Sequence, residues 1–316
     1  MSKRLYYATD IHGSEVCFLK FLKAAEFYHC DLLIMGGDIT GKMLVPLIRA
    51  GNGGVRASFN EKKWEASTEE EIEAIETRVR RSGGYPYRCA EDEYQLLIAD
   101  EAYRDKVFSE TMLNETRRLV EIAEERLSKA EIPCFMTPGN DDQLVIDGAF
   151  YGTTWLTNPE GEVVSLDENH EMISTGYANM TPWQCPRDET EESLAARIEQ
   201  MTSKLKRPET AIFNFHCPPY ASKLDDAPEL DETLRPVMRG GQQHMVPVGS
   251  KAVREAIERW QPLVGLHGHI HEAKGSNKIG RTLCFNPGSE YGTGYLRGLI
   301  LELGDNKIEM SQFTSG

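Results

Sequence analysis

The stretch Leu263-Val264-Gly265-Leu266-His267-Gly268-His269-Ile270-His271 joins a short apolar run to three histidines at alternate positions. A short apolar run closed by a turn residue is typical of a buried strand. Three imidazoles this close together would repel one another on protonation, so packing alone explains them poorly. Neutral rings that bind a cation explain them well. The stretch therefore predicts a buried strand that presents histidine ligands beyond its carboxyl end.

The same arrangement, an apolar run followed by polar residues, recurs along the chain. Helical patterns separate some of these runs, for example at Glu15–Tyr28 and Ser250–Trp260. Alternating strands and helices indicate an α/β fold, in which functional side chains gather beyond the carboxyl ends of the strands. The other runs are Leu5–Thr9 before Asp10-Ile11-His12, Leu32–Met35 before Gly36-Gly37-Asp38, Cys134–Thr137 before Gly139-Asn140-Asp141-Asp142, and Ala211–Phe215 before His216.

Taken one at a time, these polar residues are weak signals. An Asp or Asn after a strand is more often a turn or cap residue, and a lone strand-end His is usually structural. Together they mix carboxylate, amide and imidazole groups, which suits Mn²⁺, Fe or Zn²⁺ better than Mg²⁺ or Ca²⁺. Two cations about 3.5–4 Å apart need a bridging anion, for which Asp38 is the natural candidate. We therefore expect two divalent metal ions near Asp10, His12, Asp38, Asn140, His216, His269 and His271.

The order of these motifs resembles the calcineurin-like metallophosphoesterase superfamily. The matching residues are Asp10/His12, Gly37-Asp38, Gly139-Asn140, His216 and Gly268-His269-Ile270-His271. Gly176–Trp183, His216–Tyr220 and Asn286–Ser289 resemble one microbial branch of it. The resemblance implies a four-layer αββα sandwich of two mixed β-sheets flanked by helices. It also implies one metal on Asp10, His12, Asp38 and His271, and a second on Asp38, Asn140, His216 and His269.

One position departs from the superfamily pattern. Many members carry a His after the Gly-Asn pair, where it is thought to assist the leaving group, and this chain carries Asp141. A carboxylate beside two cations should stay ionised at neutral pH and is then a poor proton donor. Either the leaving group departs unaided, or its proton comes from elsewhere. We expect Asp142 to orient the site through hydrogen bonds, and His267 to pack behind the motif or to orient a ligand, with a catalytic role for His267 as the less favoured alternative.

A segment of about residues 52–129 lies outside the resemblance and shows little strand signal. Glu69–Arg81 has Ile72, Ile75 and Val79 on one helical face. A helical pattern also runs from about Ala90 to Lys129, where an unbroken helix would span about 60 Å, so a break is expected. We predict one domain over residues 1–316 with a helical insertion at about 52–129, which either packs on the core or caps the site.

Composition limits the location and the partners. The 35 Lys and Arg against 50 Asp and Glu give a net charge of −15, which disfavours general nucleic-acid binding and binding to anionic membranes. The first ten residues lack the apolar stretch of a secretory signal, and no run of about 18 apolar residues could span a membrane. The seven cysteines are scattered and fit reduced thiols. We expect a cytoplasmic protein, with a homodimer as the candidate assembly.

These features favour a dinuclear metal-dependent phosphoesterase acting on a phosphodiester or a nucleotide-type small molecule. Asp38, Asn140, Asp141 and His216 would lie nearest the reaction. The loop Thr181–Pro186 and the segment Tyr220–Arg239, with Arg235 and Arg239 as weak candidates for phosphate clamps, would border the pocket. The alternatives are a phosphoprotein phosphatase, a non-catalytic scaffold of the same fold, a mononuclear zinc hydrolase of another fold, and a nuclease.

Overall fold

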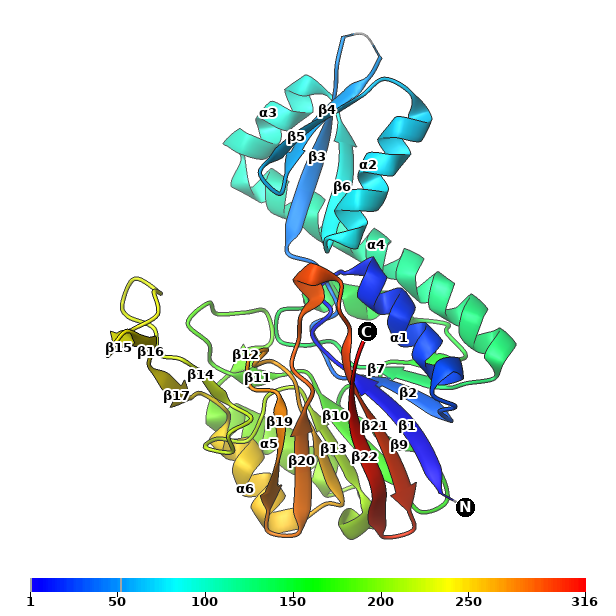
Figure 1. Ribbon diagram of the computed structural model, residues 1–316, viewed down its shortest axis with the longest axis vertical. Coiled ribbons are helices and arrows are strands. Elements are labelled where there is room, and N and C mark those ends of the chain that lie inside the picture. The colour runs from blue at the N-terminus through cyan, green and yellow to red at the C-terminus, as the bar shows by residue number, and fades with distance from the viewer. Residues whose placement is uncertain (1, 52) are drawn as a thin grey trace.

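Two six-stranded β-sheets packed face to face form the body of the protein (Figure 1). The computed structural model describes residues 2–51 and 53–316; Met1, and Asn52 at the predicted start of the insertion, lie outside the described residues. The first sheet has the order β22-β21-β1-β2-β7-β8 and the second β19-β20-β18-β13-β10-β9. The strands of the first are β1 Lys3–Ala8, β2 Leu32–Met35, β7 Cys134–Met136, β8 Leu156–Thr157, β21 Arg297–Gly304 and β22 Lys307–Ser315. Those of the second are β9 Val163–Ser165, β10 Glu171–Thr175, β13 Ile212–Phe215, β18 Val264–Leu266, β19 Gly275–Ile279 and β20 Thr282–Asn286.

Both sheets are mixed. In the first sheet β1 and β2 run parallel, whereas β1 and β21 run antiparallel. In the second sheet β13 is parallel to β10 and to β18, and β19 is antiparallel to β20. The carboxyl ends of the central strands of each sheet therefore lie at one edge, where the residues after them can meet.

Side-chain alternation along the strands produces the four layers. In β1, Leu5 and Tyr7 pack between the two sheets, and Tyr6 and Ala8 pack against the outer helices. Helices α1 (Glu15–Phe27) and α4 (Glu101–Ala130) cover the outer face of the first sheet. Helices α5 (Glu191–Thr202) and α6 (Lys251–Trp260) cover the outer face of the second. The predicted αββα sandwich is confirmed.

The insertion differs from the predicted one, because it contains a sheet as well as helices. A four-stranded sheet of order β5-β4-β3-β6 packs against α2 (Glu69–Arg81) and α3 (Glu91–Ala99). Its strands are β3 Met43–Arg49, β4 Val55–Phe59, β5 Lys62–Ala66 and β6 Gly84–Cys89. The expectation of little strand between 52 and 129 is therefore wrong, and the insertion begins at β3 rather than near 52. Two of its strands are difficult to predict from sequence. Pro46 lies within β3, where proline disfavours a strand, and β5 is a largely exposed edge strand of charged residues.

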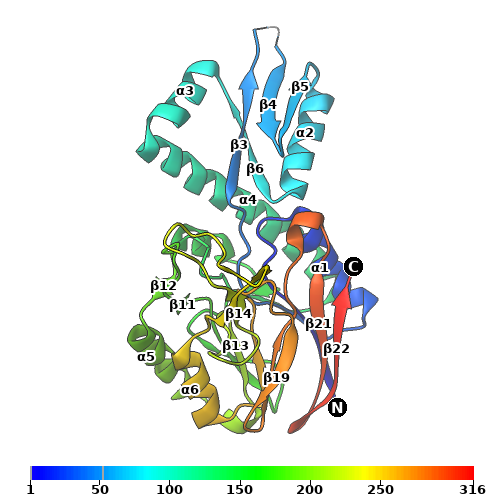
Figure 2. The ribbon, with the colours of Figure 1, turned by 60° about the vertical axis from the view of Figure 1, so that its left-hand side comes forward.

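The predicted helix 69–81 and the predicted break in the long helical pattern are both confirmed. Helix α3 ends at Ala99, and Asp100 caps α4 by accepting a hydrogen bond from the Tyr103 amide at 3.0 Å. The N-terminal part of α4 packs on the insertion through Val107 and Met112, and its C-terminal part packs on the body. Figure 2 shows this 30-residue helix lying between the two parts, so α4 connects the insertion to the first sheet.

Short elements complete the chain. The paired strands β14 (Asp226–Pro228) and β17 (Met245–Pro247), with β15 (Met238–Arg239) and β16 (Gln242–Gln243), form an arm that projects from the body in Figure 1. Strands β11 (Ala178–Asn179) and β12 (Asp188–Glu189) pair with each other, and 3₁₀ helices cover Leu144–Phe150, Pro208–Thr210 and Tyr291–Thr293.

Each of the seven cysteines is a free thiol, as predicted. Within residues 2–51 and 53–316, none of the helices combines the length and the apolar character needed to cross a bilayer.

Candidate metal centre

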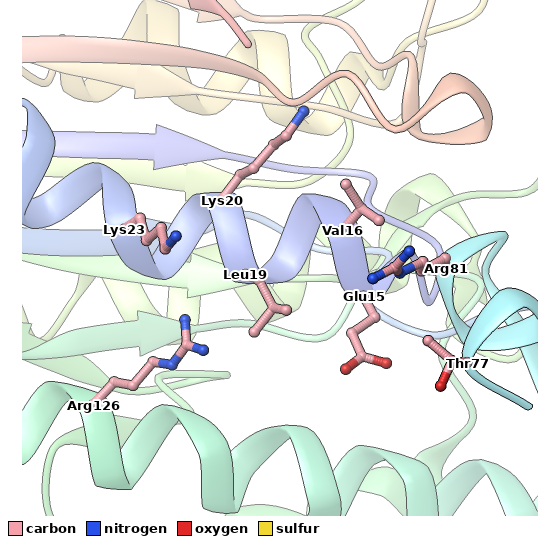
Figure 3. A pocket seen from close by; sticks show the side chains of 8 residues that line it. All are labelled: Glu15, Val16, Leu19, Lys20, Lys23, Thr77, Arg81 and Arg126. Atoms are coloured by element: carbon pink, nitrogen blue, oxygen red, sulfur yellow. The ribbon is translucent and has the colours of Figure 1, made fainter. Parts of the chain in front are cut away.

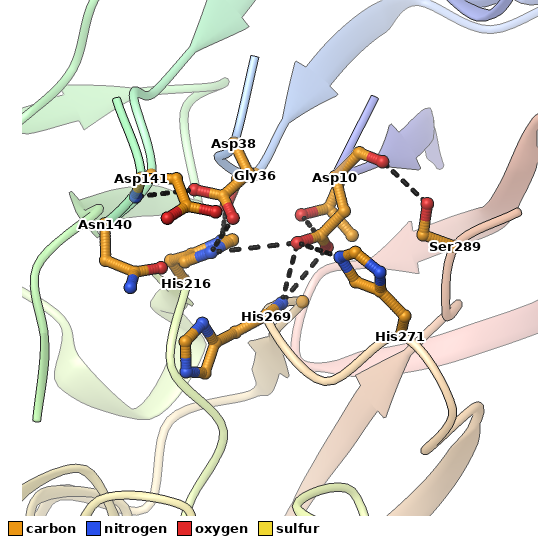
Figure 4. A network of polar contacts seen from close by, with 12 residues as sticks. Asp10, Gly36, Asp38, Asn140, Asp141, His216, His269, His271 and Ser289 are labelled. Carbon is orange, nitrogen blue, oxygen red and sulfur yellow. Dashed lines mark hydrogen bonds and ion pairs between the residues drawn. The ribbon is translucent and has the colours of Figure 1, made fainter. Parts of the chain in front are cut away.

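The seven predicted ligands come together at the carboxyl edge of the two sheets. Asp10 and His12 follow β1, Asp38 follows β2, and Asn140 follows β7 in the first sheet. His216 follows β13, and His269 and His271 follow β18, in the second. Figure 4 shows Asp10, Asp38 and Asn140 from one side facing the imidazoles from the other. The interface between the sheets thus ends in a cluster of carboxylate, amide and imidazole groups.

One part of the cluster contains Asp10, His12 and His271, whose ligand atoms lie within 4.8 Å of one another. His12 Nε2 lies 3.1 Å from His271 Nε2 and 3.6 Å from Asp38 Oδ2. His271 Nε2 lies 3.3 Å from Asp10 Oδ1. These are the four residues that the superfamily resemblance assigns to one metal.

The other part contains Asp38, His216 and His269, again with ligand atoms within 4.8 Å. His216 Nε2 lies 3.4 Å from Asp38 Oδ2 and 3.8 Å from Asp10 Oδ1. Because Asp38 lies against residues of both parts, its carboxylate is placed where a bridging anion would be needed.

Two buried atoms at the site show that its residues fit a metal. His216 donates from Nδ1 to the Gly36 carbonyl at 2.9 Å, so Nε2 is the nitrogen that can bind a metal, and this atom is buried without a hydrogen bond, with Asp38 Oδ2 3.4 Å away. Asn140 donates from Nδ2 to Asp188 Oδ1 at 3.0 Å, and this leaves its Oδ1 buried and also without a partner. Such atoms are costly to bury unless a ligand satisfies them. The two atoms are of the types that bind divalent cations.

The ligand-bearing turns adopt unusual backbone conformations. Asp10, His12, Asp38 and His269 have φ values of 55°, 41°, 50° and 66°, in the left-handed region that non-glycine residues rarely adopt. Gly37 has φ 125°, and a Cβ atom added there would overlap the His216 ring. Strain of this kind is held by the surrounding structure and concentrates at functional sites.

The electrostatics of the cluster favour added positive charge. Burial raises the pKa of Asp10, but His216 and His271 outweigh this and lower the pKa to about 2. Burial likewise opposes ionisation of Asp38, yet His216 and His12 hold the pKa of Asp38 well below its usual range. Burial lowers the pKa of His216, but Asp38 and Asp10 overcome this and raise it to about 10. Burial and His216 lower the pKa of His269 to about 4. Two ionised carboxylates therefore lie in a buried site with one charged imidazole, that of His216, and one neutral imidazole, that of His269.

Asp142 and His267 occupy different positions. Asp142 is fully buried and accepts hydrogen bonds from the amides of Gly139, Ile39 and Thr40 at 2.7–3.0 Å, so it ties the loop after β7 to the loop after β2. His267 donates from Nδ1 to the Phe215 carbonyl at 2.8 Å, and its Nε2 faces Gly265 within the second sheet. Asp142 can therefore orient the site, whereas His267 packs behind it.

Asp141 lies at the rim with two partners, Lys42, which the sequence did not suggest, and Cys185, in the loop Thr181–Pro186 that was predicted to border the pocket. Its carboxylate contacts the Lys42 ammonium group, accepts a hydrogen bond from the Cys185 thiol at 2.9 Å, and lies 4.0 Å from His12 Nδ1. The Asp141 amide donates to Asp38 Oδ1 at 3.1 Å. No motif identifies Lys42 or Cys185, because their proximity to Asp141 arises from loops distant in sequence.

Three further residues that sequence reasoning missed support the ligands. Asp188 fixes the Asn140 amide and also accepts from Thr181 Oγ1 and the Cys185 amide, so it holds the loop 181–185 beside the site. The Ser289 hydroxyl donates a hydrogen bond to the Asp10 backbone carbonyl at 2.6 Å. The Tyr291 ring packs on the His12 ring, with 4.7 Å between the two ring centres. Of these three residues, only Ser289 lies in a stretch, Asn286–Ser289, that the sequence analysis had singled out.

The two arginines proposed as clamps lie on the projecting arm. Arg239 is in β15 and pairs with Glu229 at 3.2 Å, and both Arg235 and Arg239 are exposed. Figure 1 shows the arm projecting to one side of the body, and among the described residues neither guanidinium group contacts a member of the ligand cluster.

Comparisons with known proteins support the fold. No family model matches the chain. One solved structure is 16% identical with a TM-score of 0.56 and covers 99% of this chain and 100% of its own. The structure of TT1561 of Thermus thermophilus is 13% identical with a TM-score of 0.52 and covers 100% of this chain and 99% of its own. The two-sheet fold is the one that the superfamily resemblance implies.

A sequence relative is also found. The uncharacterized protein MJ1162 of Methanocaldococcus jannaschii is 30% identical over 160 residues. The match covers 50% of this chain and 63% of that protein.

Proposed function

We propose that the protein is a metal-dependent phosphoesterase that binds two divalent cations and hydrolyses a phosphodiester or nucleotide-type small molecule. The observation that carries the proposal is the convergence of all seven ligands, with Asn140 Oδ1 and His216 Nε2 buried and without hydrogen-bond partners. A scaffold that no longer bound metal would have no need to keep these atoms unsatisfied.

Each residue has a role in this proposal. Asp10, His12, Asp38 and His271 would hold one cation, and Asp38, Asn140, His216 and His269 the other. Mn²⁺, Fe or Zn²⁺ suits the mixed ligand set. Bound cations would supply Lewis acidity to a phosphate ester and lower the pKa of an attacking water.

The remaining groups act directly on the substrate or on the ligands. Gly36 and Asp188 fix the orientation of His216 and Asn140 through hydrogen bonds at 2.9 and 3.0 Å. Lys42 lies at the rim, where its ammonium group could bind a phosphate oxygen or the departing oxygen. Asp141 would orient Lys42 rather than donate a proton itself.

The first experiment measures metal content and diesterase activity together. Elemental analysis should find about two equivalents of metal per chain. Hydrolysis of bis(p-nitrophenyl) phosphate should be lost on exhaustive chelation and restored by Mn²⁺. Asp38→Asn should abolish both properties, whereas Asp167→Asn, a carboxylate that accepts from His170 at 2.8 Å far from the cluster, should keep both.

Two outcomes would reject the proposal in different ways. Activity that persists through chelation and through Asp38→Asn would exclude metal-dependent hydrolysis. Two bound metals without turnover of monoesters, diesters or a phosphopeptide would support a scaffold instead. Faster turnover of a phosphopeptide than of cyclic and linear nucleotide diesters would favour a phosphoprotein phosphatase.

A further inference from the structure

A groove at the junction of body and insertion concentrates positive charge away from the metal ligands. One hollow of about 460 Å³ lies between α1, α4 and the end of α2 (Figure 3). A second of about 540 Å³ shares Val16, Lys20 and Arg81 with the first and extends to the β4–β5 turn and to residues 292–295. We call the two together the basic groove, after its cations Lys20, Lys23, Lys62, Arg78, Arg81 and Arg126.

The charge of the basic groove is largely uncompensated. Glu15 is the one carboxylate among the lining residues that the structure describes, and it pairs with Arg118 at 3.0 Å. Within residues 2–51 and 53–316, no carboxylate lies within 4.0 Å of the charged groups of Lys23, Arg81 or Arg126. Figure 3 shows Arg126 rising from α4 toward α1, which carries Lys23. In a chain of net charge −15, such a cluster of cations indicates an anionic ligand.

Aromatic rings line the same groove. Tyr295 is 55% exposed, and Lys20 Nζ lies 5.5 Å from the centre of its ring. The Lys20 ammonium group also donates to the Gly294 carbonyl at 2.7 Å, which fixes it beside Tyr295. Trp64 stacks on Phe59 and has the Arg78 guanidinium group 5.1 Å from its ring centre, so its ring is covered, whereas Tyr295 stays 55% exposed beside Lys20. An open aromatic ring beside cations recognises a base attached to phosphates.

The volume of the basic groove favours a small ligand over a polymer. Each hollow lies within the range of about 300–1,000 Å³ that is usual for small-molecule sites. A net charge of −15 would repel a long nucleic acid beyond the groove, but it opposes a short anion less.

We propose that the basic groove binds a nucleoside polyphosphate, at a site distinct from the metal centre. The phosphates lie along α1 and the end of α2 against Lys20 and Arg81, which line both hollows, with Lys23 and Arg126 on the side of α4, and the base lies on Tyr295. Because Arg81 ends α2 of the insertion and Lys20 lies on α1 of the body, the ligand bridges the two parts. The proposal does not depend on the proposed phosphoesterase activity.

The groove is also connected to the metal centre through one short segment. Tyr291 packs on His12, and residues 292–295, which follow it directly, line the groove. A ligand on Tyr295 therefore contacts the same segment that contacts a metal ligand. The nucleoside polyphosphate is either a separate effector or a distal part of the substrate. Cations and an aromatic ring would recognise it in the same way in both cases.

The test measures binding of ATP and of inorganic tripolyphosphate by calorimetry to the full-length protein. The titrations use the Asp38→Asn variant with a chelator present, in which the metal centre cannot form. The binding result therefore does not depend on whether the protein is a phosphoesterase. Both probes should bind, and ATP should bind more tightly. Lys20→Ala/Arg81→Ala should weaken both at least tenfold, whereas Lys20→Arg/Arg81→Lys should keep most of the affinity. Tyr295→Ala should lower the affinity for ATP to that for tripolyphosphate and leave the latter unchanged.

A matched control removes the same charge elsewhere. Lys278→Ala/Lys204→Ala, at exposed positions on other faces, should change binding by no more than about twofold. The proposal is overturned if neither probe binds, or if the groove variant and the control lose equal affinity. Tight binding of oligo(dT) without binding of ATP would also overturn it, and would identify a groove for single-stranded nucleic acid.

A second titration, with metal-loaded wild-type protein and a diester substrate, distinguishes an effector from a part of the substrate. Competition between ATP and the diester indicates a substrate subsite, and simultaneous binding indicates an effector.

Discussion

The Lys42 ammonium group contacts the Asp141 carboxylate at the rim of the ligand cluster, although 98 residues of sequence, including the whole insertion, lie between them. Asp141 occupies the position where many members of the resembled superfamily have a histidine. Lys42 directly precedes β3, at the point where the chain leaves the body for the insertion. Burial lowers the pKa of Lys42, but the hydrogen bond with Asp141 outweighs this and raises it, so Lys42 stays charged at neutral pH.

Replacing Lys42 should reduce turnover because Asp141 would then present an uncompensated negative charge to the phosphate. We expect Lys42→Met to lower kcat/KM for bis(p-nitrophenyl) phosphate by about 10–100-fold, or about 1.4–2.8 kcal/mol of transition-state stabilisation. The double variant Lys42→Met/Asp141→Asn should recover part of the loss, because the unpaired charge is removed. Strictly additive effects would show that the two side chains act independently.

Removing the metal should destabilise the protein. Two carboxylates and several imidazoles are buried together at the cluster, and cations that bind only the folded state stabilise it by about 2.7 kcal/mol at a hundred times their dissociation constant. Thermal unfolding of metal-free protein should therefore shift upward on titration with Mn²⁺ or Zn²⁺. The shift should vanish in Asp38→Asn; an equal shift in that variant would place the stabilising metal elsewhere.

Asp188 should control metal affinity without being a ligand. Its carboxylate fixes the Asn140 amide at 3.0 Å and thereby turns Oδ1 toward the cluster. Asp188→Ala should weaken metal binding by about 10–100-fold, the usual effect of losing a partner that orients a ligand. Competition with a fluorescent chelator measures this, and Asp305→Ala, in the exposed β21–β22 turn, serves as the control that should bind as wild type.

Gly37 should tolerate no side chain. Gly37 and Gly152 both have positive φ, 125° and 82°, but a Cβ atom at Gly37 would overlap the His216 ring and one at Gly152 would meet nothing within 4 Å. Gly152→Ala should cost about 1–2 kcal/mol from backbone strain alone. Gly37→Ala should cost about 1–3 kcal/mol more and should reduce metal content, because His216 must move. Denaturant unfolding measures the difference; equal losses would refute the close packing.

Metal binding should release protons at neutral pH. In the metal-free protein Asp38 and Asp10 raise the pKa of His216 to about 10, so its imidazole is protonated at pH 7, whereas a metal binds only the neutral ring. Apparent affinity should therefore rise as pH increases toward 10 and fall as pH decreases. Calorimetry of Zn²⁺ binding in two buffers of different ionisation enthalpy reports the number of protons released. A value of zero at pH 7 would contradict the raised pKa.

The sequence alone determined the strands that carry the ligands and the types of ligand that follow them. Short apolar runs closed by Gly, Asp, Asn or His specify buried strands and their turns through local chemistry, and these need no long-range information. The helix 69–81 and the break near Asp100 follow for the same reason, since periodicity and helix length are local properties.

Only the tertiary structure decided which groups meet. The sheet of the insertion was hidden by Pro46 and by the charged edge strand β5, whose pairing depends on neighbours rather than on its own residues. The contact of Asp141 with Lys42 joins the loops after the neighbouring strands β7 and β2, and the contact of Asn140 with Asp188 joins the loop after β7 to β12, which belongs to a separate two-stranded sheet. The basic groove arises where α1, α2 and α4 come together, and no single segment of the sequence contains more than part of its charge. A sequence states which side chains are present, but electrostatics and ligand geometry depend on distances that folding alone sets.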